Sequence, residues 1–171
     1  MLTLIILILG GAFLLYTLLG GADFGAGIVE TFAGKREEAT ISKAIAPVWE
    51  ANHVWLILAV VILFTGFPQV YSAISISLHI PLMMVLLGII CRGSAFTFRH
   101  YDLLQDRAHT YYSTPFRVSS FITPLFLGIV LGAMILGRIT FDTTQSFYAV
   151  FMAPWLNLFC ISMGVFSTCL F

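Results

Sequence analysis

Charged side chains are scarce in this chain of 171 residues, at 9% of the total. A typical soluble domain carries about 25%. Hydrophobic residues make up 60% of the chain, and 16 of them are phenylalanine. This balance excludes an ordinary soluble domain, and a formal net charge of zero gives no reason to expect a nucleic-acid partner. We therefore expect an integral membrane protein in contact with the lipid bilayer.

Cysteine is also rare in the sequence. The three cysteines, Cys91, Cys160 and Cys169, lie in apolar stretches without Cys-x-x-Cys spacing, so neither a disulfide framework nor a zinc site is expected. A Walker loop, a dinucleotide fingerprint, a His-Glu-x-x-His motif and a nucleophile elbow are also missing from the sequence. No histidines are paired at haem-ligand spacing. We expect a chain that binds no metal and is not catalytic by itself.

Long apolar runs dominate what is present. Since about 20 apolar residues cross a bilayer as a helix, the runs predict an all-α, polytopic transmembrane helix bundle. Four complete spanning helices and the start of a fifth are expected at about residues 2–32, 48–71, 74–100, 116–138 and 147–171. Pro81 should kink the third or mark a local bend, and residues 35–47 suggest a short interfacial helix that ends before Pro47.

The two ends of the chain lie in apolar sequence. The first run follows Met1 without a basic segment, which favours a retained span over a cleaved signal peptide. The last run is still apolar at Phe171. We interpret residues 1–171 as a single membrane domain and as the N-terminal half of a longer subunit. A naturally split subunit is the alternative.

Basic residues predict the orientation. The connections at about residues 33–44 and 92–117 hold seven of the eight lysines and arginines. Because positively charged loops stay in the cytoplasm, these two connections are expected inside and the N-terminus outside.

Two acidic residues, Asp23 and Glu50, lie where apolar runs end and begin on the predicted cytoplasmic side. An ionised carboxylate in hydrocarbon costs several kcal/mol, so such a group usually faces protein or water. One interpretation is a proton pathway held inside the protein and open to water from the cytoplasm. The alternatives are an interfacial acid at Asp23 and an ordinary first-turn glutamate at Glu50, favoured by the helix dipole.

Polar neighbours surround Glu50. His53 lies three residues on and shares its helix face, so it is a candidate proton relay, a packing residue or a haem ligand. Asn52 is a candidate hydrogen-bonding member of the same cluster. Arg92 either anchors its helix at the inner interface or balances the buried acids. Gly21 and Gly25 form a small-xxx-small pattern that lets helices approach closely, as do Gly128 and Gly132.

Three motifs of the sequence are similar to those of one known family. Residues 21–27, GADFGAG, are similar to its Gly-Phe-Asp-x-Gly-x-Gly motif. Residues 42–56, SKAIAPVWEANHVWL, are similar to its Ser-Ile-Ala-Pro-x-Trp-Asp-Gly-Asn-x-x-Trp-Leu motif. Residues 92–99, RGSAFTFR, are similar to Arg-x-x-x-Phe-x-x-Arg. The motifs keep their order and spacing, and over essentially its whole length the chain resembles subunit II of cytochrome bd-type terminal quinol oxidase.

The resemblance implies a haem-free subunit of a respiratory electron-transport complex in the inner membrane of a prokaryote. That complex oxidises quinol and reduces dioxygen to water with protons from the cytoplasm. Haem b and haem d belong to the partner, subunit I, and a small single-helix subunit is a further partner. The family's acids on helices one and two map onto Asp23 and Glu50. Trp49, Asn52 and Arg92 match motif positions and are assigned to site support or the pathway.

The sequence departs from the family at several points. Glu50 stands where aspartate is usual, Gly20 where many members have a second aspartate, and Ala51 where glycine is common. His53 occupies a variable position, so no family role transfers to it. The rival hypothesis is a secondary transporter or proton channel that uses Asp23 and Glu50 as coupling sites. A third is a purely structural subunit.

Overall fold

The computed structural model describes residues 1–32, 35–101, 108–137, 139 and 146–171. Most of these residues are helical, and none of them forms a strand. The prediction of an all-α membrane bundle is confirmed. The helices are α1 (Leu2–Glu30), α2 (Lys35–Gly66), α3 (Pro68–Ser77), α4 (His79–Tyr101), α5 (Ala108–Ile135), α6 (Phe147–Phe151) and α7 (Leu158–Leu170). By length and composition, four helical segments among them can cross a membrane: Leu2–Glu30, Ala44–Gly66, His79–Phe98 and Ser113–Ile135.

Two spanning helices are longer than the apolar runs that predict them. The interfacial segment and the second span form one continuous helix, α2, with Pro47 inside it. In the same way α5 begins at Ala108 and passes through Pro115. The connections expected at 33–44 and 92–117 are therefore mostly helical in their described parts. Apolar content marks where a helix enters the bilayer, whereas good helix formers such as Lys, Arg, Glu and Ala carry it further.

The third predicted span is broken at Leu78, three residues before Pro81, so the local bend expected at this proline is found. Leu78 has φ −110° and ψ 25°, and it ends α3 before α4 starts at His79. Pro81 lies in the first turn of α4, and because it has no N–H to bond the carbonyl of Ser77, four residues back, it favours a helix that ends there and begins again at His79. The fifth predicted span is likewise divided into α6 and α7. Asn157 caps α7 by accepting a 3.0 Å hydrogen bond from the Cys160 backbone N–H.

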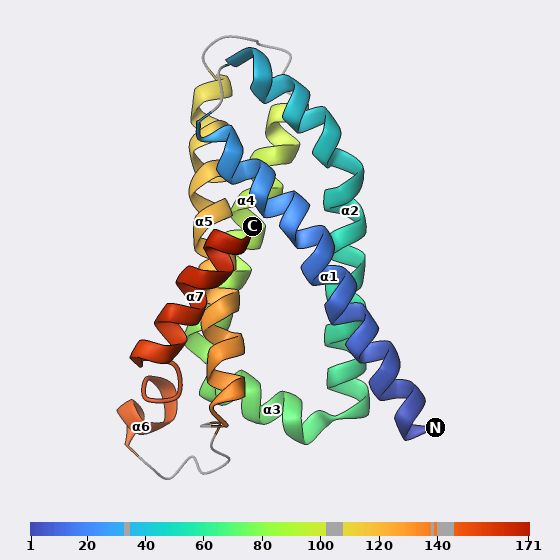
Figure 1. The fold of residues 1–171 in the computed structure, drawn as a ribbon, viewed down its shortest axis with the longest axis vertical. Coiled ribbons are helices and arrows are strands. Elements are labelled where there is room, and N and C mark those ends of the chain that lie inside the picture. Colours follow the sequence, from blue (N-terminus) through green and yellow to red (C-terminus); the bar gives the residue numbers. More distant parts are fainter. Residues whose placement is uncertain (33–34, 102–107, 138, 140–145) are drawn as a thin grey trace.

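The helices form two groups that meet at one end of the molecule (Figure 1). α1 packs along α2, while α5 packs between α4 and α7. α1 also contacts α5 and so joins the groups. Figure 1 shows this junction near the end of α1, the start of α2, the end of α4 and the start of α5, with α3 linking the groups at the opposite end. The basic segments of the sequence therefore lie at the junction end.

Close packing of α5 on α7 depends on glycine. A Cβ atom at Gly128 would lie 2.8 Å from the Cα atom of Gly164, and one at Gly132 would lie 3.0 Å from the Cα atom of Cys160. These positions confirm that the Gly128-x-x-x-Gly132 pattern lets two helices approach closely. Apolar residues pack around this contact; the buried ones are Ile74, Leu78, Ile129, Val130, Ala133 and Cys160.

Candidate functional site

One face of α1 is buried and carries the polar groups of the junction. Tyr16, Gly20, Asp23, Gly27 and Glu30 are all buried, at spacings of four, three, four and three residues. Such spacings place side chains one above the other on a single helix face. Asp23 and Glu30 are 1% and 0% exposed. The buried face is therefore polar toward the C-terminal end of the helix, although α1 is otherwise strongly apolar.

Asp23 forms an ion pair with Arg92 of α4. The Arg92 Nη2 and Asp23 Oδ1 atoms are 2.7 Å apart, and both side chains are 1% exposed. Nη2 also donates to the Asp23 backbone carbonyl, and Nη1 donates to the Ser120 hydroxyl of α5. One guanidinium thus joins three helices. Of the two hypotheses for Arg92, the structure has the arginine paired with a buried acid rather than extended to the interface.

The surroundings of Arg92 fit a planar cation. Its Cζ atom lies 4.3 Å from the centroid of the Phe116 ring and 5.2 Å from that of Phe24, within the range of cation–π attraction. Gly27 provides the space, because a Cβ atom there would lie 2.7 Å from Arg92 Nη1 and would overlap the Ser120 hydroxyl. Breaking such a buried pair by removing one partner typically costs about 3–5 kcal/mol, since the other charge is left uncompensated.

Glu30 is a second buried acid, and it was not among the predicted site residues. Its Oε1 atom lies 3.7 Å from Arg117 Nε, and the side chain of Arg117 is 29% exposed. Glu30 also interacts electrostatically with Arg92. The signal that points to Glu30 is its spacing of seven residues from Asp23, which puts both acids on the buried face of α1. Ser120 was missed as well.

Glu50 has a different environment from Asp23. It is exposed on the surface of this chain, whereas Asn52 is 1% exposed. Val54, Ile57 and Phe64 of α2 are 62%, 61% and 58% exposed. Glu50 lies four and seven residues from Val54 and Ile57, so it shares one outward helix face with them. Of the two carboxylates, only Asp23 is therefore buried within this chain.

An aromatic cluster lies on the side of α2 that faces α4. The Trp49 ring centroid is 5.3 Å from that of Phe96 on α4 and 4.8 Å from that of His53. A Cβ atom on Gly93 would lie 3.1 Å from Trp49 Cζ2. The His53 Nδ1 atom is 2.8 Å from the Trp49 carbonyl oxygen. Because a carbonyl only accepts, Nδ1 carries the proton and Nε2 of a neutral His53 is an acceptor.

The remaining predicted positions have packing environments. A Cβ atom at Gly21 would lie 3.3 Å from the Phe171 ring at the end of α7, and Gly25 lies against the Phe171 backbone oxygen. Among the described residues, no three His, Cys, Asp or Glu side chains gather closely enough to hold a metal ion. Gly21 and Gly25 are packed against Phe171 and lie on a different face of α1 from Asp23.

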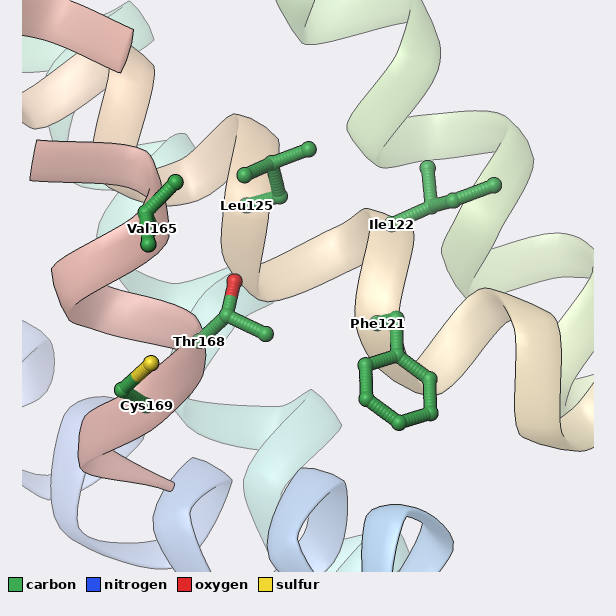
Figure 2. Close-up of a pocket in the computed structure, with 6 residues that line it drawn as sticks. All are labelled: Phe121, Ile122, Leu125, Val165, Thr168 and Cys169. Atoms are coloured by element: carbon green, nitrogen blue, oxygen red, sulfur yellow. The ribbon is translucent and has the colours of Figure 1, made fainter. Parts of the chain in front are cut away.

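A separate cavity of about 250 Å³ lies between α5 and α7 (Figure 2). Its lining residues are Phe121, Ile122, Leu125, Val165, Thr168 and Cys169. Figure 2 shows the α5 residues on one side and the α7 residues on the other. The lining contains neither carboxylate nor Arg92, so this cavity is not part of the polar site.

Comparison with known proteins covers the whole chain. The family model for cytochrome bd terminal oxidase subunit II matches residues 1–171. Over 166 residues the chain is 28% identical to cytochrome bd-I ubiquinol oxidase subunit 2 of Escherichia coli (strain K12), covering 94% of this chain and 43% of that protein. Over 155 residues it is 32% identical to cytochrome bd ubiquinol oxidase subunit 2 of Bacillus subtilis (strain 168), covering 89% and 45%.

A third relative is named as an oxidase of a different quinol. The chain is 30% identical over 128 residues to a putative cytochrome bd menaquinol oxidase subunit II of Bacillus subtilis (strain 168), covering 72% of this chain and 36% of that protein. The chain spans less than half the length of each of these three relatives.

Proposed function

Because this chain belongs to the cytochrome bd terminal oxidase subunit II family, we propose that it works as a haem-free subunit of a bd-type quinol oxidase. The complex couples oxidation of quinol to reduction of dioxygen to water. The observation that carries this proposal is the family match over all 171 residues. Haem b and haem d are bound by the partner subunit I, and this chain supports that subunit in the membrane together with a small single-helix subunit.

The position of the basic residues supports an orientation of the chain in the membrane. The helix ends carrying most of the lysines and arginines meet there (Figure 1), and positively charged segments favour the cytoplasm. The N-terminus then lies outside, and Glu30, Asp23 and Glu50 lie toward the cytoplasmic half of the bilayer of a prokaryotic inner membrane.

Different roles are proposed for the two carboxylates. Asp23 is held by Arg92, and removing its charge would leave a buried cation unpaired. Glu50 lies on an outward face of apolar residues, where a carboxylate facing lipid alone would be costly. We therefore assign proton uptake from the cytoplasm to Glu50, at a surface covered by the partner subunit. Asn52 and His53 support it from the same helix, and Trp49 packs beside them.

Purification of the complex from its native membrane tests the proposed function. An oxidase subunit should be recovered with a haem-bearing partner, and the preparation should show a haem absorption spectrum and quinol-dependent oxygen consumption. Recovery of the chain alone or as a haem-free homo-oligomer would instead support the rival hypothesis of a transporter or proton channel. The same preparation carrying Glu50→Gln should keep its haem spectrum and consume oxygen more slowly.

A further inference from the structure

A short segment at the end of the molecule opposite the junction exposes large apolar side chains. Residues 146–158, the α6 segment, run from the residue before α6 to the first residue of α7. Figure 1 shows α6 at the level where α1 starts and α5 ends. Phe147 and Tyr148 are 67% and 59% exposed, and Leu156 and Leu158 are 45% and 84% exposed. Exposed apolar side chains gathered in this way mark a contact with a protein or a membrane.

The composition of the α6 segment is unusual for a connection between helices. Its sequence, SFYAVFMAPWLNL, contains no charged residue. Tyr148 and Trp155 combine a large apolar ring with one polar atom, and such side chains are enriched where a membrane meets water. Asn157 is occupied within the chain, because it caps α7. The composition therefore favours a poorly hydrated environment at the edge of a bilayer over bulk water.

The backbone of the α6 segment satisfies its own hydrogen bonds, although regular helix covers only Phe147–Phe151. Its N–H groups donate to carbonyls within the segment at 2.9–3.3 Å; the donors are Val150, Met152, Ala153, Trp155, Leu156 and Asn157. Pro154 has no N–H, and the Trp155 indole Nε1 donates to the Phe151 carbonyl at 2.6 Å. Unsatisfied backbone groups are what exclude irregular segments from lipid. This segment can therefore lie in a layer with little water.

Val150 holds α6 against the rest of the molecule. Its side chain is 2% exposed, and α6 packs on α3. The Phe147 and Phe151 rings lie beside each other, with centroids 4.8 Å apart. Phe147 and Tyr148 precede Val150 by three and two residues and are exposed. One side of α6 is thus buried in the fold, and the other presents apolar rings outward.

We propose that the α6 segment is a membrane-interface anchor, with its exposed side chains inserted among lipids where headgroups meet acyl chains. Interfacial segments bury apolar side chains about 5–10 Å into this boundary and gain from the area they bury. The adjoining helices fix the level, because the span in α5 ends at Ile135 and the next apolar helix begins at Leu158. The segment thus joins two helix ends at one membrane surface. The anchor does not depend on the proposed oxidase activity.

Lipid fits this surface better than a second protein. A protein interface is bounded by a polar rim. Here the exposed apolar surface continues along α7 through side chains that are 41%, 42%, 51% and 59% exposed, namely Phe159, Ile161, Val165 and Phe166. The α6 segment also carries no charge that a protein partner could complement. A neutral lipid layer meets these conditions without any specific partner side chain.

Thiol labelling of the intact complex in opened native membranes tests the anchor. Tyr148→Cys is treated with a charged maleimide that stays in water or with an uncharged, membrane-soluble maleimide. Mass spectrometry then measures the label at position 148 against the fully unfolded complex. The expected result is labelling by the uncharged reagent and loss of labelling by the charged one. Val150→Cys, on the buried side of α6, is the matched control and should react with neither reagent.

Two other outcomes of the labelling would overturn the anchor. Full labelling of Tyr148→Cys by the charged maleimide would mean that α6 lies in water. Labelling by neither reagent, as for Val150→Cys, would mean that another protein segment covers α6 in the complex.

Substitutions of Leu156 test the anchor independently, in nanodiscs of phosphatidylcholine. Leu156→Asp places a charge in the poorly hydrated layer and should lower the thermal unfolding midpoint of the complex. Leu156→Trp enlarges the side chain but suits an interface, so the midpoint should stay nearly unchanged. An unchanged midpoint for Leu156→Asp would contradict the anchor. A fall for Leu156→Trp as large as that for Leu156→Asp would indicate a close-fitting protein contact and would also overturn it.

Discussion

Asp23 and Glu50 are similar in sequence and different in structure. Each is a single acid at one end of an apolar run, and each matches an acidic motif position of the family. Asp23 is buried against Arg92, and Glu50 is exposed on an outward face of α2. The difference shows that the environment of an acid in a membrane helix depends on what its side of the helix packs against. A face that meets other helices within the chain favours ion pairing, whereas an outward face needs a partner outside it.

The largest expected effect on assembly comes from Arg92→Gln. Asp23 would remain buried without its cation, at a cost of about 3–5 kcal/mol. We expect almost no haem-containing complex in the membrane, measured by absorption spectroscopy and by the amount of co-purified partner. The double variant Arg92→Gln, Asp23→Asn removes both charges and should recover part of the assembly. Normal assembly of Arg92→Gln alone would contradict a structural role for the pair.

Gly27→Ala should have the next largest effect. The new methyl group would displace Ser120 and Arg92 and distort the ion pair without changing any charge. Overpacking of this kind typically costs about 1–3 kcal/mol, so the thermal unfolding midpoint of the complex should fall clearly. Gly10→Ala is the matched control, because no atom lies within 4 Å of its methyl group. Equal midpoints for the two variants would mean that Arg92 is not held against Gly27.

Ser120→Ala should weaken the complex less. It removes the acceptor for Arg92 Nη1 but leaves the contact between Arg92 and Asp23 in place. The loss of one hydrogen bond to a charged group suggests a cost of about 1.5–3 kcal/mol at most, with relaxation reducing it. The midpoint should fall less than in Gly27→Ala, and the order of the two midpoints is the result to check.

Glu50→Gln should have the smallest effect on assembly. The residue is exposed on this chain, so the amide can take its place without leaving a buried charge unpaired. Oxygen consumption per haem should nevertheless fall by about tenfold or more if the carboxylate carries protons. Glu50→Asp keeps the ionisable group and should recover part of the rate. A normal rate in Glu50→Gln would remove the assigned proton role.

The sequence predicted the helices better than their ends. Hydropathy is enough to identify a span, but it does not show that α2 begins at Lys35 or that the chain bends at Leu78. The first depends on helix propensity outside the bilayer. The second was expected near Pro81, and its position also depends on the packing of Leu78, which is fully buried in the cluster with α5 and α7.

Some residues of the polar site could be predicted individually, but their arrangement in space could not. Asp23 and Arg92 stand out because charges are rare in apolar runs, but they are 69 positions apart, so only the fold shows that they pair. Glu30 was predictable from its seven-residue spacing to Asp23. Ser120 was not, because serine in a spanning helix commonly bonds its own backbone, as Ser120 also does to the Phe116 carbonyl at 2.6 Å.

The most direct test of the contrast compares Asp23→Asn with Glu50→Gln in the same membrane. The amount of assembled haem complex and the oxygen consumption per haem should be measured for both. Asp23→Asn should sharply lower the amount of complex and leave the rate per remaining haem close to normal, while Glu50→Gln should do the reverse. The same loss of rate at full assembly in both variants would contradict the separation of a structural Asp23 from a proton-carrying Glu50.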